Sequence, residues 1–497
     1  MAFNTLILSA GVLIFVYVGL FILQEWTQSK EEPHMAEAAV PFFGSILQMM
    51  TQKTAFYLQM KAKYRFPIYT LRMPWARIYV VNDASLISAA QRQFRALNFP
   101  VIMGKAIGKI AGTSPATNEI MNRDLATDNG FLVGFNKAIH YTVSAGPELD
   151  RLNRDAIHSF ATSIDRFSAG GPRSVSLFSW VRSEVLLGTT DAVYGPFNPF
   201  RDPKIESDWY TFEPGVTTLA LKFIPNFLNG RTIQARERIV EAFLVYFRGG
   251  KHESASGLVK ARYDYIVKKH EIHDLVDVAR LEVAGAFGTI SNSSPAAFWL
   301  LYHLFANPHI LEDCRRELST LVEERDGTCY LDANGIPKEC PTILSSFNEV
   351  LRYHGVQVSL RKVVEDHALE DKYLLKRGSA LMMPATVQHF DHEIWGPNSR
   401  EFDHKRFMPL GNDGYRKGAQ RAAFRGFGGG HHLCPGRHFA TTEIVAFAAL
   451  IVLRFDMEPV TGTWTKLKTD KLSSKGSAVT LPDNDLEVMV KPRDTNI

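Results

Sequence analysis

One cysteine of this chain lies on a glycine-rich loop directly ahead of a helical pattern, an arrangement that can present a thiolate to a metal. The stretch Phe427–Gly436 reads Phe-Gly-Gly-Gly-His-His-Leu-Cys-Pro-Gly, and the cysteine is Cys434. Glycine lets the backbone approach a flat cofactor closely and adopt positive φ without penalty. A helix that begins at about Arg437 offers free N–H groups and a positive dipole end, which favour an anionic sulfur. The pattern therefore predicts that Cys434 is a metal ligand.

Two other interpretations of this stretch are an ordinary loop cysteine and a zinc half-site made of His431, His432 and Cys434. A zinc site needs further ligands at recognisable spacing. No Cys-x-x-Cys pair is formed by the other three cysteines, which are Cys314, Cys329 and Cys340. Four scattered cysteines in 497 residues also do not indicate a disulfide framework, so we expect a reducing compartment for the body of the protein.

The cysteine stretch resembles the heme-binding loop of the cytochrome P450 family. The positions of that family's pattern are occupied here by Phe427, Gly430, His432, Cys434 and Gly436. The resemblance implies that Cys434 is the axial thiolate of the iron in heme b, a ligand that pushes electron density toward O–O cleavage. It places His432 where most members have an arginine that meets a heme propionate. Histidine can donate there as well, although its charge would depend on pH.

A long helix is predicted from about Asp274 to Phe305, with Pro295 distorting it locally and small residues opening a groove. In heme-thiolate monooxygenases this helix crosses above the heme, where a small residue, an acid and a threonine deliver protons to dioxygen. Our alignment places Gly288, Ser291 and Asn292 at these positions, so both usual groups are lacking.

The segment that begins at Asn292 resembles a branch of the family that contains bile-acid steroid hydroxylases and prostacyclin synthase and has Asn in place of the threonine. We expect Asn292, Ser293 and Ser291 to be the catalytic residues of this helix. Alternatively, these side chains satisfy backbone groups that the kink frees.

Four further residues match family positions that stabilise the cofactor site or contact the cofactor. Glu349 and Arg352 can pair on one helical face, which by itself would indicate a surface salt bridge. The family's Glu-x-x-Arg pair, however, locks with an arginine from a downstream loop, and Arg406 matches that arginine. The resemblance thus implies structural support of the cysteine loop by these three residues. Arg361, on a predicted strand, matches a second propionate contact; a water-facing strand arginine is the alternative.

The composition is that of an ordinary globular protein, with 45% hydrophobic and 22% charged residues and no long linker between residues 40 and 490. Helical periodicity dominates residues 85–325, and residues 67–83 predict a β-hairpin. We therefore expect a fold that is mainly α with a small β subdomain (α+β), the cytochrome P450 fold by resemblance. Residues 33–497 would form the heme-thiolate catalytic domain.

Residues 1–32 are expected to be an N-terminal membrane anchor and linker. The sequence from Thr5 to Leu23 is uncharged and mostly apolar, and at ~1.5 Å per residue it spans roughly 28 Å, close to the ~30 Å hydrocarbon layer. A cleaved signal peptide is the alternative, but residues 1–4 carry no Lys or Arg. By resemblance to microsomal family members, the protein would be single-pass in the endoplasmic reticulum membrane, with its catalytic domain facing the cytosol.

A basic segment surrounds the cysteine loop, because residues 405–438 contain seven Lys or Arg and one acid, Asp413. The basic residues are Lys405, Arg406, Arg416, Lys417, Arg421, Arg425 and Arg437. Such a segment could steer an acidic partner or simply be a solvated loop. By resemblance the partner is NADPH–cytochrome P450 reductase, with cytochrome b5 as a second candidate. The net charge of +4 is too small to indicate nucleic acid.

The resemblance implies a monooxygenase that uses O2 and NADPH-derived electrons to hydroxylate or similarly oxidise a steroid, a terpenoid or another lipophilic secondary metabolite. A separate reductase is expected, because the chain has no flavin or dinucleotide fingerprint. Asn292 leaves open a reductase-independent isomerase or dehydratase that acts on a peroxide. A non-catalytic heme sensor is a third hypothesis. Substrate contacts are expected within residues 95–135 and 200–230.

Overall fold

The computed structural model describes residues 2–74, 76–220, 229–325, 328–409, 418–470 and 478–493. Arg416, Lys417 and Asp413 of the basic segment and residues 221–228 of the expected substrate region lie outside the described residues. The chain divides into two compact units. The first unit comprises Met1–Ile102, Val356–Ser399 and Lys417–Leu433, and the second comprises Met103–Gly355, Arg400–Arg416 and Cys434–Ile497.

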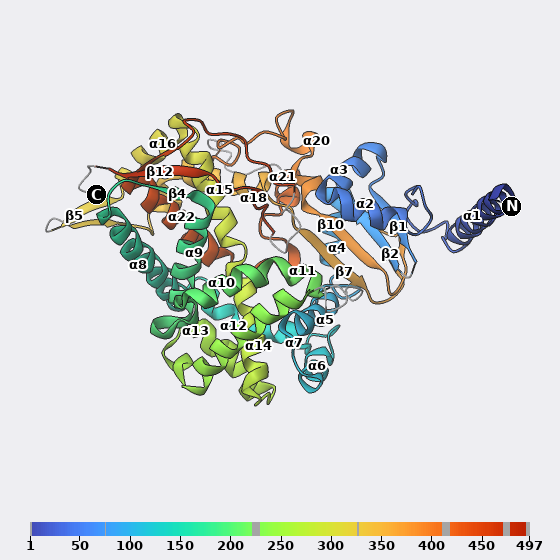
Figure 1. The fold of residues 1–497 in the computed structure, drawn as a ribbon, viewed down its shortest axis with the longest axis horizontal. Helices are drawn as coiled ribbons and strands as arrows, with labels where there is room; N and C mark the ends of the chain where they lie inside the picture. The colour runs from blue at the N-terminus through green and yellow to red at the C-terminus, as the bar shows by residue number, and fades with distance from the viewer. Residues whose placement is uncertain are drawn as a thin grey trace. The chain divides into compact units, whose positions relative to one another are not determined.

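The first unit is built on a five-stranded sheet with strand order β1-β2-β10-β7-β3. Its strands are β1 Ile68–Met73, β2 Ala76–Val81, β3 Leu97–Asn98, β7 Val358–Val363 and β10 Ala380–Pro384. β1 and β2 form the predicted antiparallel hairpin, and β10 joins β2 in parallel (Figure 1). Alternate residues such as Tyr79, Val81 and Leu381 bury one face of the sheet against Ile87 of α4.

Short helices and a second hairpin complete the first unit. These elements are α2 Gly44–Gln52, α3 Thr54–Lys63, α4 Ala84–Arg92, α19 Ala385–His389, α20 His392–Trp395, α21 Gly418–Ala423, β8 His367–Leu369 and β9 Tyr373–Leu375. Helix α5, Pro100–Ala111, begins in this unit and ends in the second.

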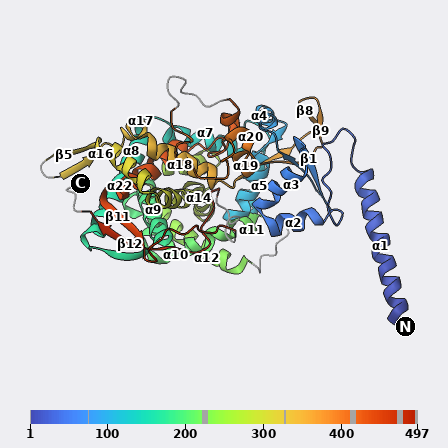
Figure 2. The same ribbon diagram turned by 90° about the horizontal axis from the view of Figure 1, so that it is seen from above.

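The N-terminal helix α1, Ala2–Trp26, extends away from β1 (Figure 2). Within the described residues it contains one segment, Ser9–Trp26, that is long and apolar enough to cross a membrane. The linker that follows is fixed to the sheet, since the Thr70 N–H donates to the His34 carbonyl at 2.8 Å. The carboxylate of Glu32 is buried, and it accepts a hydrogen bond from the Tyr79 hydroxyl at 2.6 Å.

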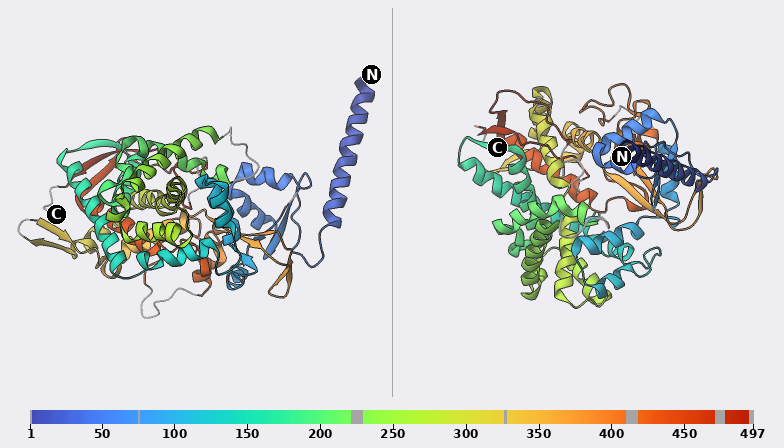
Figure 3. Two further views of the ribbon diagram at one scale, coloured as in Figure 1. Left: turned by 90° about the horizontal axis from the view of Figure 1, so that it is seen from below. Right: turned by 45° about the vertical axis from the view of Figure 1, so that its right-hand side comes forward.

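The second unit is mainly helical. Its helices are α6 Pro115–Asn122, α7 Phe131–Val143, α8 Pro147–Ala169, α9 Leu177–Tyr194, α10 Pro203–Phe212, α11 Val216–Ala220, α12 Gly230–Arg248, α13 Gly257–Asp264, α14 Leu275–Ile290, α15 Ser293–Phe305, α16 Pro308–Ser319, α17 Ile336–Glu339, α18 Pro341–Tyr353 and α22 Arg437–Arg454. Its strands are β4 Arg173–Ser176, β5 Val322–Arg325, β6 Thr328–Leu331, β11 Phe455–Pro459 and β12 Glu487–Pro492. In the left view of Figure 3, the teal strand β4 lies beside the red strands β12 and β11. The predicted fold class, mainly α with a small β part, is confirmed.

The expected long helix is two helices, α14 and α15, separated at Ser291 and Asn292. The prediction had the distortion at Pro295, inside one continuous helix. The observed break lies upstream and leaves Pro295 in the first turn of α15, where an N–H has no intrahelical partner and proline is tolerated. Breaking the helix there is therefore less costly than bending it around the proline.

Candidate functional site

Cys434 directly precedes α22, as the sequence predicted, and Gly436 is the residue at which that helix is capped. The Cys434 carbonyl accepts hydrogen bonds from the N–H of Arg437 at 3.4 Å and from its guanidinium Nη1 at 3.3 Å. Burial raises the pKa of the Cys434 thiol, and the Gly436 N–H and Arg437 only partly offset this effect. The helix start thus only partly favours the thiolate, and a bound metal cation would favour it further.

The preceding loop requires glycine for steric reasons. Gly430 has φ of 63°, and a Cβ there would lie 2.8 Å from the Cβ of Gln91. At Gly429 a Cβ would lie 2.5 Å from Nη1 of Arg425. Phe427 lies in the turn ahead of these glycines and is half-buried. Within the first unit, the backbone at Gly429 and Gly430 thus approaches Arg425 and Gln91 closely only because these two positions have no side chain.

Two arginines and one histidine form a buried basic cluster in the first unit. Arg361 on β7 is 2% exposed, and its guanidinium lies 5.2 Å from the centre of the Phe99 ring. The His432 ring lies 4.9 Å from the same ring. Burial lowers the pKa of Arg361 and that of Arg425 each to about 10. Within the described residues neither arginine has a carboxylate partner.

His432 is the third member of this cluster, and its imidazole is neutral at pH 7. Burial, with help from Arg361 and His431, lowers the pKa of His432 to about 4. Its Nε2 is buried and has no hydrogen-bond partner within the described part of the chain. An anionic group of a ligand would offer a partner to His432 Nε2 and a counter-charge to the two guanidiniums, whose protein acceptors include the Leu360 carbonyl for Arg361.

The expectation that Arg425 is exposed is wrong. The sequence placed it in an exposed basic segment, but it is 6% exposed and belongs to the buried cluster. Its backbone N–H donates to Nε2 of His389 at 2.9 Å. Its position two residues before Phe427 is the signal that could have associated it with the cofactor loop.

Glu349, Arg352 and Arg406 meet in the second unit, as predicted. Arg352 donates from Nε and Nη2 to the two carboxylate oxygens of Glu349, each at 2.7 Å, and Arg406 Nε donates to Oε1 at 3.1 Å. The Asp403 N–H donates to the same Oε1 at 2.9 Å. Glu349 and Arg352 are fully buried, so the alternative of a surface salt bridge is wrong. The network lies on α18, which packs against α22.

The three residues expected above the heme have different surroundings. The Ser291 hydroxyl donates to the Phe287 carbonyl at 2.7 Å, which is the backbone role offered as the alternative. Asn292 is exposed, like Gly288 one turn earlier, although most residues near them in α14 and α15 are buried. The side-chain oxygen of Asn292 accepts from the Ala478 N–H at 2.7 Å.

Glu443 on α22 is a buried group that the sequence analysis missed. The Ser293 hydroxyl donates to its Oε1 at 2.6 Å, and the Thr189 hydroxyl donates to its Oε2 at 2.8 Å. Burial raises the pKa of Glu443 to about 7. A signal was present, because Glu443 is the one acidic residue in an apolar helix pattern between Arg437 and Arg454.

His303 and His354 form a buried imidazole pair near the Glu349 network, with their Nε2 atoms 2.9 Å apart. Burial lowers the pKa of His303 to about 3 and that of His354 well below its ordinary value. Both groups are therefore neutral in the folded protein, and acid favours the unfolded chain, which binds protons more readily. We expect the free energy of unfolding to decrease from about pH 6.5 toward pH 3, by up to ~1.4 kcal/mol per pH unit for each imidazole.

Urea unfolding of the holoprotein at several pH values would measure this slope. His303→Phe keeps a ring stacked on Phe402, which lies 3.6 Å away, and should flatten the slope. An unchanged acid slope in that variant would contradict the assignment.

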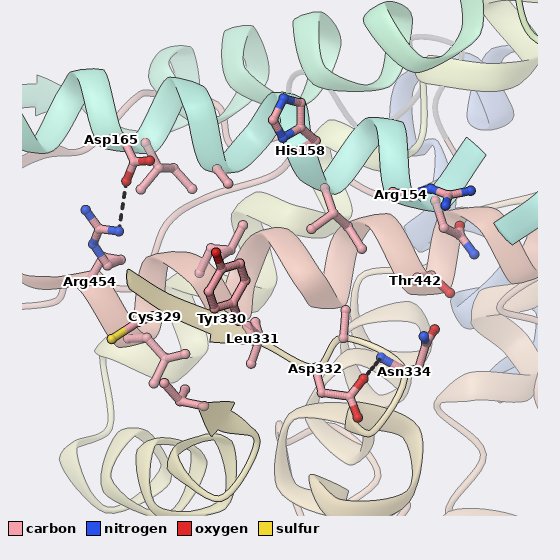
Figure 4. Close-up of a pocket in the computed structure, with 18 of the residues that line it drawn as sticks. Arg154, His158, Asp165, Cys329, Tyr330, Leu331, Asp332, Asn334, Thr442 and Arg454 are labelled. Atoms are coloured by element: carbon pink, nitrogen blue, oxygen red, sulfur yellow. Dashed lines mark hydrogen bonds and ion pairs between the residues drawn. The ribbon is translucent and has the colours of Figure 1, made fainter. Parts of the chain in front are cut away.

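A cavity of about 850 Å³ lies elsewhere in the second unit, between α8, α22 and the β5–β6 hairpin (Figure 4). An ion pair between Arg454 and Asp165, 2.8 Å apart, closes one end. Ile157 and Leu450 are among the apolar residues that line it. None of the predicted site residues lines this cavity, so it is separate from the candidate site.

Comparison with known proteins supports one family. The family model described as Cytochrome P450 matches residues 270–486. The cytochrome P450 monooxygenase nodJ of Hypoxylon pulicicidum is 30% identical over 93% of this chain and 90% of that protein. The chain belongs to the cytochrome P450 family. More distant similarity extends to cytochrome P450 7A1 of Oryctolagus cuniculus, 25% identical over 52% of this chain and 53% of that protein. It also extends to prostacyclin synthase of Rattus norvegicus, 29% identical over 43% of this chain and 45% of that protein.

As a cytochrome P450 monooxygenase, the protein uses heme with an axial cysteine thiolate. The residues present fit that group. Heme carries two propionates, and the first unit offers two buried guanidiniums and the unpartnered Nε2 of His432. Burial raises the pKa of the Cys434 thiol, and a bound metal cation favours the thiolate form. The zinc interpretation finds no support among the described residues, where no group of three metal-ligating side chains occurs.

Proposed function

We propose that this P450 oxidises a lipophilic small molecule, such as a steroid, a terpenoid or another secondary metabolite, with electrons that NADPH–cytochrome P450 reductase supplies. The observation that carries the proposal is Cys434 at the start of α22 in a chain whose full-length relative is named a monooxygenase. The branch similarity to cytochrome P450 7A1 supports a lipophilic substrate.

In this proposal Cys434 is the axial ligand of the heme iron, on the loop formed by Phe427, Gly430 and Gly436. His432 and Arg361 would bind the heme propionates, and the guanidinium of Arg425 would be a third contact to them. The bound heme activates dioxygen for insertion into the substrate. Glu349, Arg352 and Arg406 fix the α18 side of the second unit, on which α22 and its cysteine rest.

We also propose that Asn292, Ser293 and Ser291, which lie at the break between α14 and α15, are the catalytic residues of this region. Asn292 would contribute its side-chain amide, whose oxygen accepts a hydrogen bond from the Ala478 N–H. An amide of this kind orients an oxygen molecule but neither gains nor loses a proton at neutral pH. Ser291 supports the last turn of α14 through its bond to the Phe287 carbonyl.

We propose that the reductase docks on the exposed basic residues of the segment 405–438. Arg425 is not one of them, because it is buried. Lys405→Glu and Arg421→Glu should each slow reductase-driven heme reduction roughly tenfold at low salt, because steering by complementary charge is lost. The measurement is the rate at which the reduced carbon monoxide complex appears after NADPH addition. Lys204→Glu, on an exposed lysine of α10 outside this segment, is the matched control. Equal rates for all three variants and the wild type would contradict the docking site.

A second candidate function is a reductase-independent isomerase or dehydratase that acts on a peroxide. Asn292 in the threonine position and the similarity to prostacyclin synthase favour it. Turnover of a lipid endoperoxide or hydroperoxide without NADPH would select this function. Strict dependence on NADPH and oxygen would eliminate it.

We also propose that residues 1–32 attach the catalytic domain, residues 33–497, to the endoplasmic reticulum membrane, with that domain in the cytosol. The apolar residues of α1 from Val12 to Trp26 are largely exposed, which supports a lipid-facing helix. Phe43, Leu47 and Met50 form a second exposed apolar group, because each is at least half exposed and they are at helical spacing on or beside α2. The linker after α1 is bonded to β2 through the Tyr79 hydroxyl and the Glu32 carboxylate.

A further inference from the structure

The cavity between α8, α22 and the β5–β6 hairpin has the size of a small-molecule binding site. Its volume of about 850 Å³ lies within the range of roughly 300–1,000 Å³ that is usual for such sites. Figure 4 shows α8 along one side, with Arg154 and Asp165 near its two ends. These residues are roughly 16 Å apart along the helix at ~1.5 Å per residue. The cavity is therefore elongated.

Apolar side chains line the cavity between its two ends. Ile157, Ala161 and Ile164 lie on one face of α8 at helical spacing, and Leu450 and Leu453 of α22 also line the cavity. Contact between such surfaces and water is unfavourable, so they favour an apolar ligand that displaces the water.

The two ends of the cavity differ in the hydrogen bonds that they can offer. At one end Arg454 and Asp165 pair with each other at 2.8 Å. At the other end, where Figure 4 shows Arg154 and Thr442, uncharged polar groups are present. Asn153, next to Arg154 on α8, lines the cavity, and its side-chain oxygen is buried without a hydrogen-bond partner in the described residues. A donor group of a ligand would satisfy this oxygen.

The charges around the cavity disfavour an ionic ligand. Two guanidiniums and three carboxylates line it, so the formal balance is one negative charge when histidine is counted as neutral. Asp150 and Arg154 are four residues apart on α8, a spacing that allows them to pair. Asp332 is exposed and accepts the Asn334 N–H at 3.0 Å. An anion would meet excess negative charge, and no carboxylate among the described lining residues is both buried and unpaired, as a cation site would require.

We propose that this cavity binds a neutral lipophilic alcohol of the size of a sterol or a multi-ring terpenoid. The apolar rings lie between α8 and α22, against Ile157 and Leu450, and the hydroxyl group donates a hydrogen bond to the side-chain oxygen of Asn153. This ligand binds outside the heme site, so the inference goes beyond the proposed oxidation and does not depend on it.

The first test locates the ligand by photolabelling. The full-length holoprotein in phosphatidylcholine nanodiscs is treated with clotrimazole, whose imidazole occupies the heme iron, and with a photoreactive diazirine analogue of cholesterol. Mass spectrometry should find the label on peptides of α8. Ala161→Trp, which fills the cavity, should lose this label, whereas the matched control Val245→Trp, on an exposed valine of α12, should keep it. A wild type without label on α8, or equal labelling of Ala161→Trp, would overturn the proposal.

The second test examines the chemistry of the ligand by competition with the photoreactive probe. Cholesteryl methyl ether lacks the hydroxyl proton and should compete roughly tenfold less well than cholesterol, because the Asn153 oxygen is left without a donor. In Asn153→Ala the two compounds should compete equally. Cholesteryl sulfate should compete poorly, because it is an anion. Equal competition by the ether and cholesterol in the wild type, or stronger competition by the sulfate, would contradict a neutral alcohol as the ligand.

The Cys329 thiol offers a measurement that needs no crosslinking. Cys329 lines the cavity and is partly exposed, whereas Cys314 and Cys340 are buried. Cholesterol at about ten times its Kd should slow the reaction of Cys329 with N-ethylmaleimide roughly tenfold in the wild type, because only the unoccupied fraction reacts. Ala161→Trp should show no such protection. All variants should keep the reduced carbon monoxide spectrum, so absence of protection in a wild type with this spectrum would overturn the cavity proposal and leave the proposed oxidation intact.

Discussion

Cys434→Ala should lose the thiolate-type Soret band of the reduced carbon monoxide complex, and its NADPH-dependent oxidation activity should fall to background. The reason is chemical, because a thiolate ligand is what directs bound dioxygen toward O–O cleavage. Alanine provides no replacement ligand. The spectrum of the purified variant, beside that of the wild type, is the measurement.

Cys329→Ala is the control for this experiment. Cys329 is a partly exposed cysteine on β6 and lies more than one hundred residues from the loop in sequence, so its removal should leave spectrum and activity unchanged. A wild-type spectrum in Cys434→Ala, or absence of the thiolate band in the wild type, would refute the assignment of Cys434.

Glu349→Gln should lower the free energy of unfolding by about 3–5 kcal/mol, because removing one partner of a buried ion pair leaves uncompensated charge. Here the uncompensated groups would be the guanidiniums of Arg352 and Arg406, both buried against the lost carboxylate. The change is isosteric, so packing alone cannot account for the loss. Urea unfolding monitored by heme absorbance would measure it, with earlier heme release expected.

Asp313→Asn is the matched control, because Asp313 and Arg316 form an acid–arginine pair at the same three-residue spacing on the exposed surface of α16. Removing that carboxylate should change the free energy of unfolding by less than about 1 kcal/mol. Equal effects of the two substitutions would mean that the buried network does not stabilise the fold.

The local sequence predicted the features that depend on short segments. The turn between Ile68 and Val81 lies between two β-rich runs, so the hairpin was predictable. The pairing of Glu349 with Arg352 follows from helical spacing, although the spacing could not tell a buried pair from an exposed one. Arg406 required the family pattern, because it is more than fifty residues downstream in the chain.

The break before Ser293 shows where periodicity misleads. Apolar spacing continues from α14 into α15, so the sequence predicts one helix. The hydrogen bond from Ala478 to the Asn292 side chain comes from a segment far along the chain, and no local pattern contains it. Long-range contacts of this kind decide whether a proline-containing segment forms one bent helix or two separate helices.

The sequence by itself determined the position of Cys434, because a glycine loop followed by a helix start is encoded within about ten residues. Only the tertiary structure decided which charged groups are buried. Arg425 and Arg421 are four residues apart with the same charge, yet one is buried beside Arg361 and the other is exposed. Likewise, burial between helices raises the pKa of Glu443, and the hydroxyls of Ser293 and Thr189 on two other helices partly offset that rise. Burial and ionisation are properties of packed neighbours, and those neighbours are distant in the chain.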